Sequence, residues 1–130
     1  MFRLPILTLA ALTLAAPLAA QTQSETFTQG ATAITLHLHP FLTEEEATIL
    51  RVVGESPDAL ALFVPAGNGF GALALAPEDG FIRDGLPVDS AAAVAELPDL
   101  AQARDAALAQ CNSARSGGAA CVVVLEIAPR

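Results

Sequence analysis

The sequence contains no lysine, and its six basic residues are all arginines. Against them stand 14 acidic residues, so the formal net charge is −8 at pH 7. Nucleic acids and anionic membrane surfaces attract basic proteins, so this acidic, arginine-poor chain is not expected to bind either of them. Acidity of this kind favours solubility and names no partner.

Motifs that carry chemistry are also scarce. No serine stands in the glycine-flanked context of a nucleophile elbow. The glycines from Gly67 to Gly71 superficially suggest a phosphate-binding loop, but no helix is expected after them, so a hairpin turn is the better interpretation. Glu78, Asp79 and Asp84 lack the ligand order of an EF-hand and fit a solvated acidic turn. The sequence therefore predicts no catalytic and no cofactor-binding residues.

Residues 1–20 have the three parts of a secretory signal peptide. Arg3 supplies the positive charge, residues 4–14 form the apolar core, and small residues lead to an expected cleavage after Ala20. The apolar run is too short for a transmembrane helix. We therefore expect a periplasmic or secreted protein, without membrane insertion after signal removal, whose mature length of about 110 residues suits one small domain.

The first part of the mature chain predicts a frayed end, a strand and a helix. Residues 21–32 are polar and are expected to be a flexible N-terminus, followed by a single small α+β domain over residues 33–130. Residues 33–39 alternate apolar and polar side chains, which is typical of a strand with one solvent-facing side near a sheet edge. Thr43 and Glu46 fit a capping box and predict the start of a helix.

Apolar segments dominate the middle of the chain. Residues 59–64 and 70–76 predict two strands joined as a hairpin with a longer loop. Residues 91–97 are compatible with either a helix or a strand. Pro98 argues against one continuous helix through this region, so a strand that pairs back on residues 70–76 is preferred.

The last part of the chain predicts a helix, a glycine-rich turn and a strand. Asp99 can cap a helix whose apolar stripe includes Cys111. Residues 121–127 are rich in β-branched side chains and fit a strand inside a sheet. The resulting order, β-α-β-β-(β)-α-β, favours two helices packed on one face of a largely antiparallel sheet. Without the bracketed strand, the order is that of a ferredoxin-like split βαβ domain.

Cys111 and Cys121 are the only cysteines. In an exported chain such a pair favours a structural disulfide, here between the inward side of the last helix and the start of the last strand. The alternative, a redox-active pair, lacks both the Cys-x-x-Cys spacing and a basic neighbour close in sequence.

Several short segments resemble known proteins. Gly71-Ala-Leu-Ala74, the alanine-rich helix that ends in Cys111, and Cys121-Val-Val-Val resemble the core of small secreted bacterial domains of unknown function. The whole chain is also similar to short proteobacterial periplasmic proteins that are sometimes labelled 5-aminolevulinate synthase. The resemblance implies a fold and the disulfide, and it carries no established active site.

The synthase label conflicts with the composition. That enzyme holds pyridoxal phosphate as a Schiff base on a lysine, and this chain has none. The chain is also too short for that fold and carries an export signal. We therefore reject the label as a description of its chemistry, and expect no cofactor.

His37 and His39 are the best candidates for a chemical site. On a strand they share one face, about 6.5 Å apart, so that a metal ion could bridge them with Glu44, Glu45 or another acid as third ligand. The plainer interpretation is two solvent-facing histidines on an edge strand, because isolated His-x-His pairs are common.

Three hypotheses of function follow. The first is a non-enzymatic periplasmic binding or accessory module, suggested by export, a small disulfide-bonded domain and the lack of a catalytic motif. The second is a small metal-binding protein or metal-dependent enzyme that uses His37 and His39. The third is an envelope stress or structural protein that a partner recognises through a sheet edge.

Overall fold

The computed structural model describes residues 22–63 and 69–130. The predicted signal peptide, its cleavage site and most of the predicted turn around Gly67 lie outside these residues. In chain order the elements are β1 (Gln23–Gln29), β2 (Thr32–Leu38), α1 (Glu44–Glu55), α2 (Pro57–Phe63), β3 (Phe70–Leu75), β4 (Ile82–Arg83), β5 (Leu86–Pro87), β6 (Ala92–Leu97), α3 (Leu100–Ala114) and β7 (Val122–Pro129).

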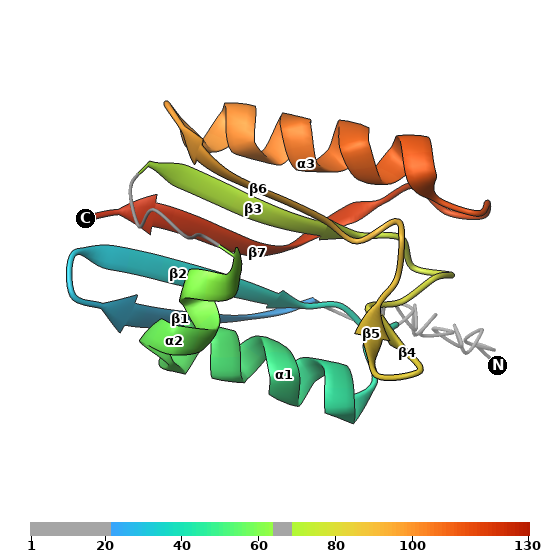
Figure 1. Cartoon of the computed structure of the whole chain (residues 1–130), viewed down its shortest axis with the longest axis horizontal. Helices are drawn as coiled ribbons and strands as arrows, with labels where there is room; N and C mark the ends of the chain where they lie inside the picture. Colours follow the sequence, from blue (N-terminus) through green and yellow to red (C-terminus); the bar gives the residue numbers. More distant parts are fainter. Residues whose placement is uncertain (1–21, 64–68) are drawn as a thin grey trace, which may run out of the picture.

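Five strands form one antiparallel sheet in the order β1-β2-β7-β3-β6 (Figure 1). The predicted α+β class and the largely antiparallel sheet are confirmed. β7 lies in the middle, as its β-branched residues indicated, and β6 pairs with β3, as preferred for residues 91–97. Because β2 and β3 both run antiparallel to β7, they are parallel to each other with β7 between them, which makes the connection through α1 and α2 a split βαβ unit.

The helices cover opposite faces of the sheet. Side chains alternate between the two faces along a strand, and both faces of β3 are buried. Ala72 and Ala74 belong to the cluster that includes α3, whereas Leu73 and Leu75 belong to the cluster that includes Leu50 of α1. The sequence pattern predicts both helices on one face, and this part of the prediction is wrong. Since both sides of β3 are apolar, each side needs its own helical cover, and the alanine side lets α3 approach closely.

The start of α1 confirms the predicted capping box. The Thr43 hydroxyl accepts a hydrogen bond from the Glu46 N–H at 3.1 Å, and the Thr43 N–H donates to the Glu46 carboxylate at 3.0 Å. Residues Glu44 and Glu45 add negative charge in the first turn, where the helix dipole favours it. The start of α1 is therefore specified by a local sequence pattern.

The predicted strand at residues 59–64 is wrong. Pro57–Phe63 forms helix α2, so β3 has no hairpin partner before it and pairs with β7 and β6 instead. The Ser56 hydroxyl accepts a hydrogen bond from the Ala59 N–H at 3.3 Å, and proline occupies the first helical position. A capping serine followed by proline is a helix-start signal, and here it outweighs the uniformly apolar run that suggested a buried strand.

The N-terminal segment is also more ordered than expected. β1 occupies most of residues 21–32, which the sequence analysis assigned to a flexible N-terminus. A two-residue turn at Gly30 and Ala31 folds β1 back on β2, and the positive φ of Gly30 (56°) suits such a hairpin. Gln29 then ties β1 to the end of α1, because its side-chain amide donates to the backbone oxygens of Val53 at 3.1 Å and Gly54 at 2.6 Å. β2 is consequently one strand in from the sheet edge.

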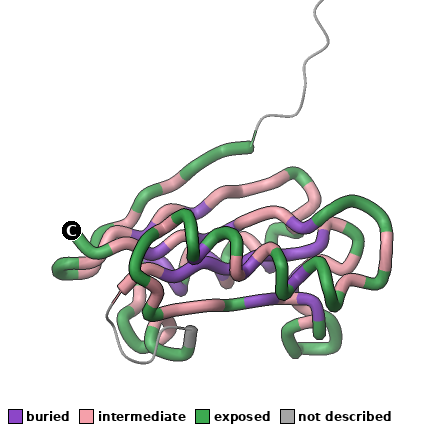
Figure 2. The backbone as a smooth tube through the Cα atoms, turned by 90° about the horizontal axis from the view of Figure 1, so that it is seen from above, coloured by how far each residue is buried: buried purple, intermediate pink, exposed green. Residues whose placement is uncertain are grey.

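A small hairpin, β4–β5, lies beside the start of α1 (Figure 1). Its two-residue turn is Asp84-Gly85, and both residues have positive φ (55° and 79°), as the favoured hairpin turn requires. Buried positions run along the strands and inner helix faces, while the turns at both ends of the sheet are exposed (Figure 2). The outer sides of α1, α2 and this hairpin therefore face the solvent, where a partner or ligand could reach them.

Candidate functional site

An apolar groove lies between α1, α2 and the β4–β5 hairpin. Its volume is about 390 Å³, within the range of small-molecule and side-chain binding sites. Ten residues line it: Thr48, Ile49, Val52, Val53, Ala59, Leu62, Phe81, Ile82, Gly85 and Pro87. Only Thr48 among them has a polar side chain, so the groove offers almost nothing but apolar contact.

The most exposed large apolar side chains of the described residues come from the same three elements. Leu62 of α2 is 82% exposed, Leu86 of β5 is 69% exposed and Val52 of α1 is 48% exposed. Exposed apolar residues scattered singly need no explanation, but a cluster around a groove marks an interaction site. Val52 and Leu62 belong to the lining of the groove, and Leu86 stands in the chain between two other lining residues, Gly85 and Pro87.

A buried carboxylate holds one wall of the groove in place. Glu46 is 6% exposed and accepts hydrogen bonds from the backbone N–H groups of Phe81 and Ile82, the latter at 2.9 Å. Burial by itself raises the pKa of Glu46, but the hydrogen bonds from Thr43, Ile82 and Phe81 outweigh it and hold the pKa below its usual value. Glu46 of α1 therefore holds the segment at Phe81 and Ile82, which lines the groove, against the start of α1.

The elements that surround the groove carry more acidic than basic side chains. Their exposed carboxylates are Glu44, Glu45, Glu55, Asp58 and Asp84. Of the two arginines on these elements, Arg51 is paired with Glu25 at 2.9 Å, and Arg83 donates to the Asp79 backbone oxygen. The potential around the apolar surface is therefore negative.

His37 lies on the opposite face of the sheet from the groove, in a hydrogen-bonded chain. Its Nδ1 is 3.1 Å from the Ser24 hydroxyl, and its Nε2 is 3.3 Å from the Glu126 carboxylate. Arg104 of α3 holds the same carboxylate with two hydrogen bonds, at 2.7 and 3.0 Å. Burial raises the pKa of Glu126, but Arg104 and then His37 lower it further than burial raises it, so the net pKa lies below the usual value.

His39 is held separately from His37. Its Nδ1 is 3.2 Å from the Thr22 hydroxyl, its Nε2 donates to the backbone oxygen of Val123 at 3.0 Å, and its ring stacks on Phe41. His37 lies in β2 and His39 directly follows that strand, and each already has a partner on both ring nitrogens. Within residues 22–63 and 69–130, no group of three or more metal-ligating side chains comes together. Metal binding at His37 and His39 would therefore require existing hydrogen bonds to break.

Ser24, His37 and Glu126 have the residue types of a nucleophilic triad. In such a triad the serine meets Nε2 of the histidine and the acid meets Nδ1, whereas here the two nitrogens are exchanged. Glu126 is also neutralised by Arg104, which reduces its ability to stabilise an imidazolium. Ser24 lies in the β1–β2 ladder, opposite His37, rather than on a strained turn that presents a nucleophile. The geometry therefore fits a structural polar network better than catalysis.

A second cleft, of about 340 Å³, lies between the end of β2 and α1 and includes His39, Glu44 and Arg51. Its polar groups are mostly committed to one another or to neighbours. Arg51 pairs with Glu25, and the Thr48 hydroxyl donates to the Glu44 backbone oxygen at 2.8 Å. This cleft consequently offers a ligand fewer free groups than its composition suggests.

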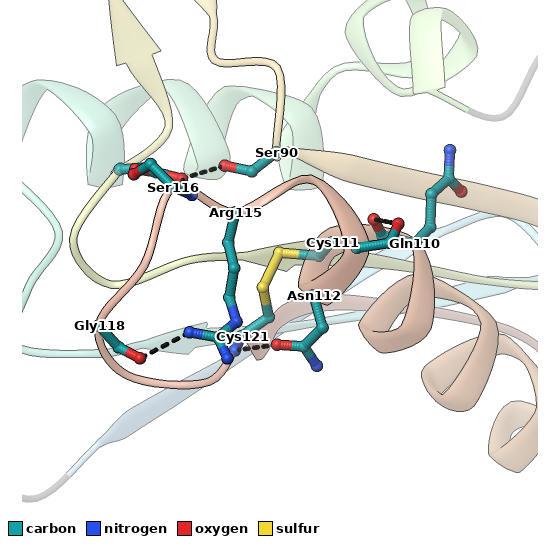
Figure 3. Close-up of a disulfide and its surroundings, with 10 residues drawn as sticks. Ser90, Gln110, Cys111, Asn112, Arg115, Ser116, Gly118 and Cys121 are labelled. Carbon is teal, nitrogen blue, oxygen red and sulfur yellow. Dashed lines mark hydrogen bonds between the residues drawn. A yellow bond between two sulfur atoms is a disulfide. The ribbon is translucent and has the colours of Figure 1, made fainter.

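The predicted disulfide is confirmed. Cys111, in the last turn of α3, is bonded to Cys121 just before β7, and their Cα atoms are 6.1 Å apart (Figure 3). The Asn112 side chain accepts a hydrogen bond from the Cys121 N–H at 2.9 Å, and Arg115 donates to the Gly118 backbone oxygen (Figure 3). Both cysteines are buried, at 0% and 7% exposure, so the bond is placed for structure rather than for exchange with a redox partner.

The remaining candidate motifs have structural partners. Gly69 and Gly71 approach the backbone of β6, while Gly67 lies outside the described residues. Asp79 accepts hydrogen bonds from the hydroxyls of Ser116 and Ser90, and these bonds lower its pKa. It therefore joins the turn after β3 to the end of α3, as expected of an acidic turn and not of a cation site.

No helix in the described part of the chain has the length and apolar character needed to cross a membrane. Three features of the described residues bear on function: the disulfide-bonded α+β fold, the apolar groove and the histidine network. Comparison of the chain with protein-family models, with curated proteins and with solved structures found no match.

Proposed function

We propose that this chain is a non-enzymatic binding or accessory module that works in the periplasm or as a secreted protein, and that the groove between α1, α2 and β4–β5 is its binding site. The observation that carries the proposal is the apolar groove, with Leu62 and Val52 of its lining exposed, on a molecule of formal net charge −8. Leaving such side chains in water is unfavourable, and a partner that covers them removes that cost.

The chemistry of the groove selects the kind of partner. An apolar floor without free hydrogen-bonding side chains suits aliphatic or aromatic side chains rather than a polar metabolite. The exposed carboxylates on the surrounding elements, among them Glu55, Asp58 and Asp84, favour positive charge on the partner. The occupant is therefore an amphipathic segment of another protein, apolar on one side and basic at its margins.

The disulfide and the sequence resemblance support the location. A buried structural disulfide persists in oxidising compartments, and residues 1–20 have the pattern of a signal peptide. The resemblance to small secreted bacterial domains implies the same location and brings no active site with it. The resemblance to proteins labelled 5-aminolevulinate synthase adds no chemistry, because the chain has no lysine.

The test compares two synthetic peptides on the disulfide-bonded protein by fluorescence anisotropy. Both peptides form an amphipathic helix with one leucine face; one carries arginine on its polar face and the other carries glutamate. The arginine peptide is expected to bind at least tenfold more tightly, and Leu62→Ser is expected to weaken its binding at least tenfold, whereas Ala109→Ser on the outer face of α3 leaves it unchanged. Equal binding of both peptides, or binding that survives Leu62→Ser, would contradict the proposal.

Metal binding at His37 and His39 remains the alternative. The observation in its favour is that His37, in β2, and His39, directly after it, are two positions apart, with the Glu126 carboxylate 3.3 Å from His37. The hydrogen bonds that already occupy the four ring nitrogens count against it.

A further inference from the structure

The two edges of the five-stranded sheet differ. β6 at one edge is irregular: its register on β3 shifts between Phe70 and Ala72, and Glu96 has a left-handed backbone with φ of 62°. β1 at the other edge pairs with β2 without interruption, from Gln23 opposite Leu38 to Gln29 opposite Thr32. Bulges and distorted backbone protect an edge against further pairing, so only the β6 edge is protected in this way.

β1 also lacks the side chains that normally block an edge. It contains no proline and no lysine, two of the devices that keep sheet edges from pairing. Its single charge, Glu25, is neutralised by Arg51 at 2.9 Å. The strand is seven residues long and exposes Ser24, Thr26 and Thr28 on the face away from α1. Within the described residues, β2 is its only strand partner.

The hairpin sets which backbone groups face outward. A two-residue turn closes on its flanking pair, here Gln29 and Thr32, so alternate residues of β1 from Gln29 backward are directed at β2. The residues between them, Ser24, Thr26 and Thr28, then direct their N–H and C=O groups away from the sheet. These groups need partners, which are either water or another strand.

We propose that the partner is a second copy of this chain, which pairs its β1 antiparallel to the first about a two-fold axis at Thr26. The strand is nearly palindromic in chemistry around that point. Gln23 then lies opposite Gln29, Ser24 opposite Thr28, and Thr26 opposite its own copy, so amides meet amides and hydroxyls meet hydroxyls. The two five-stranded sheets become one continuous sheet, and the interface is the same patch on both copies.

Charge fixes this register against its neighbours. With the axis at Thr26, Glu25 lies opposite Phe27, and no two like charges face each other. An axis at Glu25 would place the two glutamates directly opposite, which is unfavourable. An axis at Phe27 would leave part of the seven-residue strand unpaired. The Thr26 register alone pairs every residue of β1, and Arg51 of each copy stays beside Glu25 on the face that α1 covers.

A charge-swap experiment at the axis tests the proposal. Sedimentation equilibrium of the disulfide-bonded chain is expected to show a dimer at high micromolar concentration. Thr26→Lys and Thr26→Glu each place like charges opposite each other at the axis, so each variant alone is expected to be a monomer. An equimolar mixture of the two restores the dimer, because the charges are then complementary. Thr35→Lys, on the neighbouring strand β2, is the matched control and is expected to remain a dimer.

Amide hydrogen exchange provides a reading that needs no variant. Protection of the amides of Ser24, Thr26 and Thr28 is expected to rise with protein concentration, while that of the residues between them stays constant. A wild-type chain that is monomeric up to about 1 mM overturns the proposal. So does a dimer that persists in both single variants, or one whose concentration-dependent protection lies outside β1.

Discussion

The carboxylate of Glu46 accepts a hydrogen bond from the backbone N–H of Phe81, a residue 35 positions further along the chain. The same carboxylate closes the capping box of α1 through the Thr43 N–H. One side chain therefore both starts a helix and anchors the segment that leads into the β4–β5 hairpin. That segment forms one wall of the apolar groove. The shape of the groove therefore depends on Glu46, which is not among the residues that line it.

Replacement of this group is predicted to destabilise the fold. Glu46→Ala leaves the N–H groups of Phe81 and Ile82 without their acceptor, and we expect the free energy of unfolding to fall by about 2–4 kcal/mol. Urea denaturation at pH 7 measures the loss. Glu46→Gln keeps one acceptor oxygen and is expected to lose less, so equal losses in the two variants would argue against the hydrogen bonds as the cause.

The same interaction predicts sensitivity to acid. The folded-state pKa of Glu46 lies below that of an unfolded carboxyl group, so its contribution is fully present above the unfolded pKa and is lost as the pH falls through the folded one. The stability difference between wild type and Glu46→Gln is therefore expected to shrink below about pH 4. Denaturation curves at several pH values measure it; a difference that grows toward low pH would reverse the sign assigned here.

The disulfide is predicted to be structural. Breaking it by reduction, or by Cys111→Ser together with Cys121→Ser, is expected to lower the stability by about 2–4 kcal/mol without changing peptide binding at the groove. Thiol titration of the denatured, unreduced protein is expected to find no free thiol. Two free thiols in protein taken from an oxidising compartment would contradict the bond between Cys111 and Cys121.

Local signals made α1, α3, β7 and the disulfide predictable. The capping box of Thr43 and Glu46 and the cap of Asp99 are short-range patterns, and each has the predicted hydrogen bonds. The two cysteines had only one internal partner each. Where an element is specified by its own residues, the sequence is sufficient to place it.

Two elements that were not predicted also have short-range sequence signals. Ser56-Pro57 marks the start of α2, and Asp84-Gly85 marks the β4–β5 hairpin. β1 is different, because its polar residues carry no apolar alternation and it becomes a strand only by pairing with β2. The placement of the helices on opposite faces likewise depends on strand order, which no local pattern encodes.

The groove could not be predicted for the same reason. Its lining comes from α1, α2 and the β4–β5 hairpin. The sequence predicts a strand in place of α2 and predicts no element at the hairpin. His37 lies in the predicted strand, whereas His39 directly follows the end of β2. Of their partners, Ser24 comes from β1, and Glu126 and Val123 come from β7 near the other end of the chain. These contacts depend on strand pairing, so no local sequence pattern predicts them.

A single added methyl group is predicted to disturb the sheet at Gly71. A Cβ atom there would lie 2.8 Å from the backbone oxygen of Val94, and a backbone oxygen in a strand ladder cannot easily move away. We expect Gly71→Ala to lower the melting temperature and to cost about 1–3 kcal/mol, although alanine normally favours order over glycine. Ala93→Ser, at an exposed position of the adjacent strand, is the control and is expected to be nearly neutral.

Zinc is predicted to bind weakly, if at all, at His37 and His39. Each imidazole nitrogen has a partner, and a metal ion would have to displace the Ser24 and Glu126 contacts or the Thr22 and Val123 contacts. Titration calorimetry at pH 7 is expected to show no sub-micromolar site. Sub-micromolar zinc or copper binding that disappears in His37→Ala would instead favour the metal-binding alternative over the binding module.

Export is predicted to remove the first residues. Intact-mass measurement on protein from the cell envelope is expected to show a chain that begins at or near Gln21. Retention of Met1 in that pool would contradict the assigned location and, with it, the reason for expecting the disulfide to persist.

The position of β7 has a consequence for the order of events during synthesis. β7 lies between β2 and β3 in space, yet a ribosome makes it after both. Until residues 122–129 have been made, β2 and β3 have no shared neighbour, and at most the two separate strand pairs β1–β2 and β3–β6 can form. Formation of the sheet therefore waits for contacts between residues far apart in the chain, which form slowly. A transport apparatus that accepts only unfolded chains would therefore meet this protein before its five-stranded sheet could form.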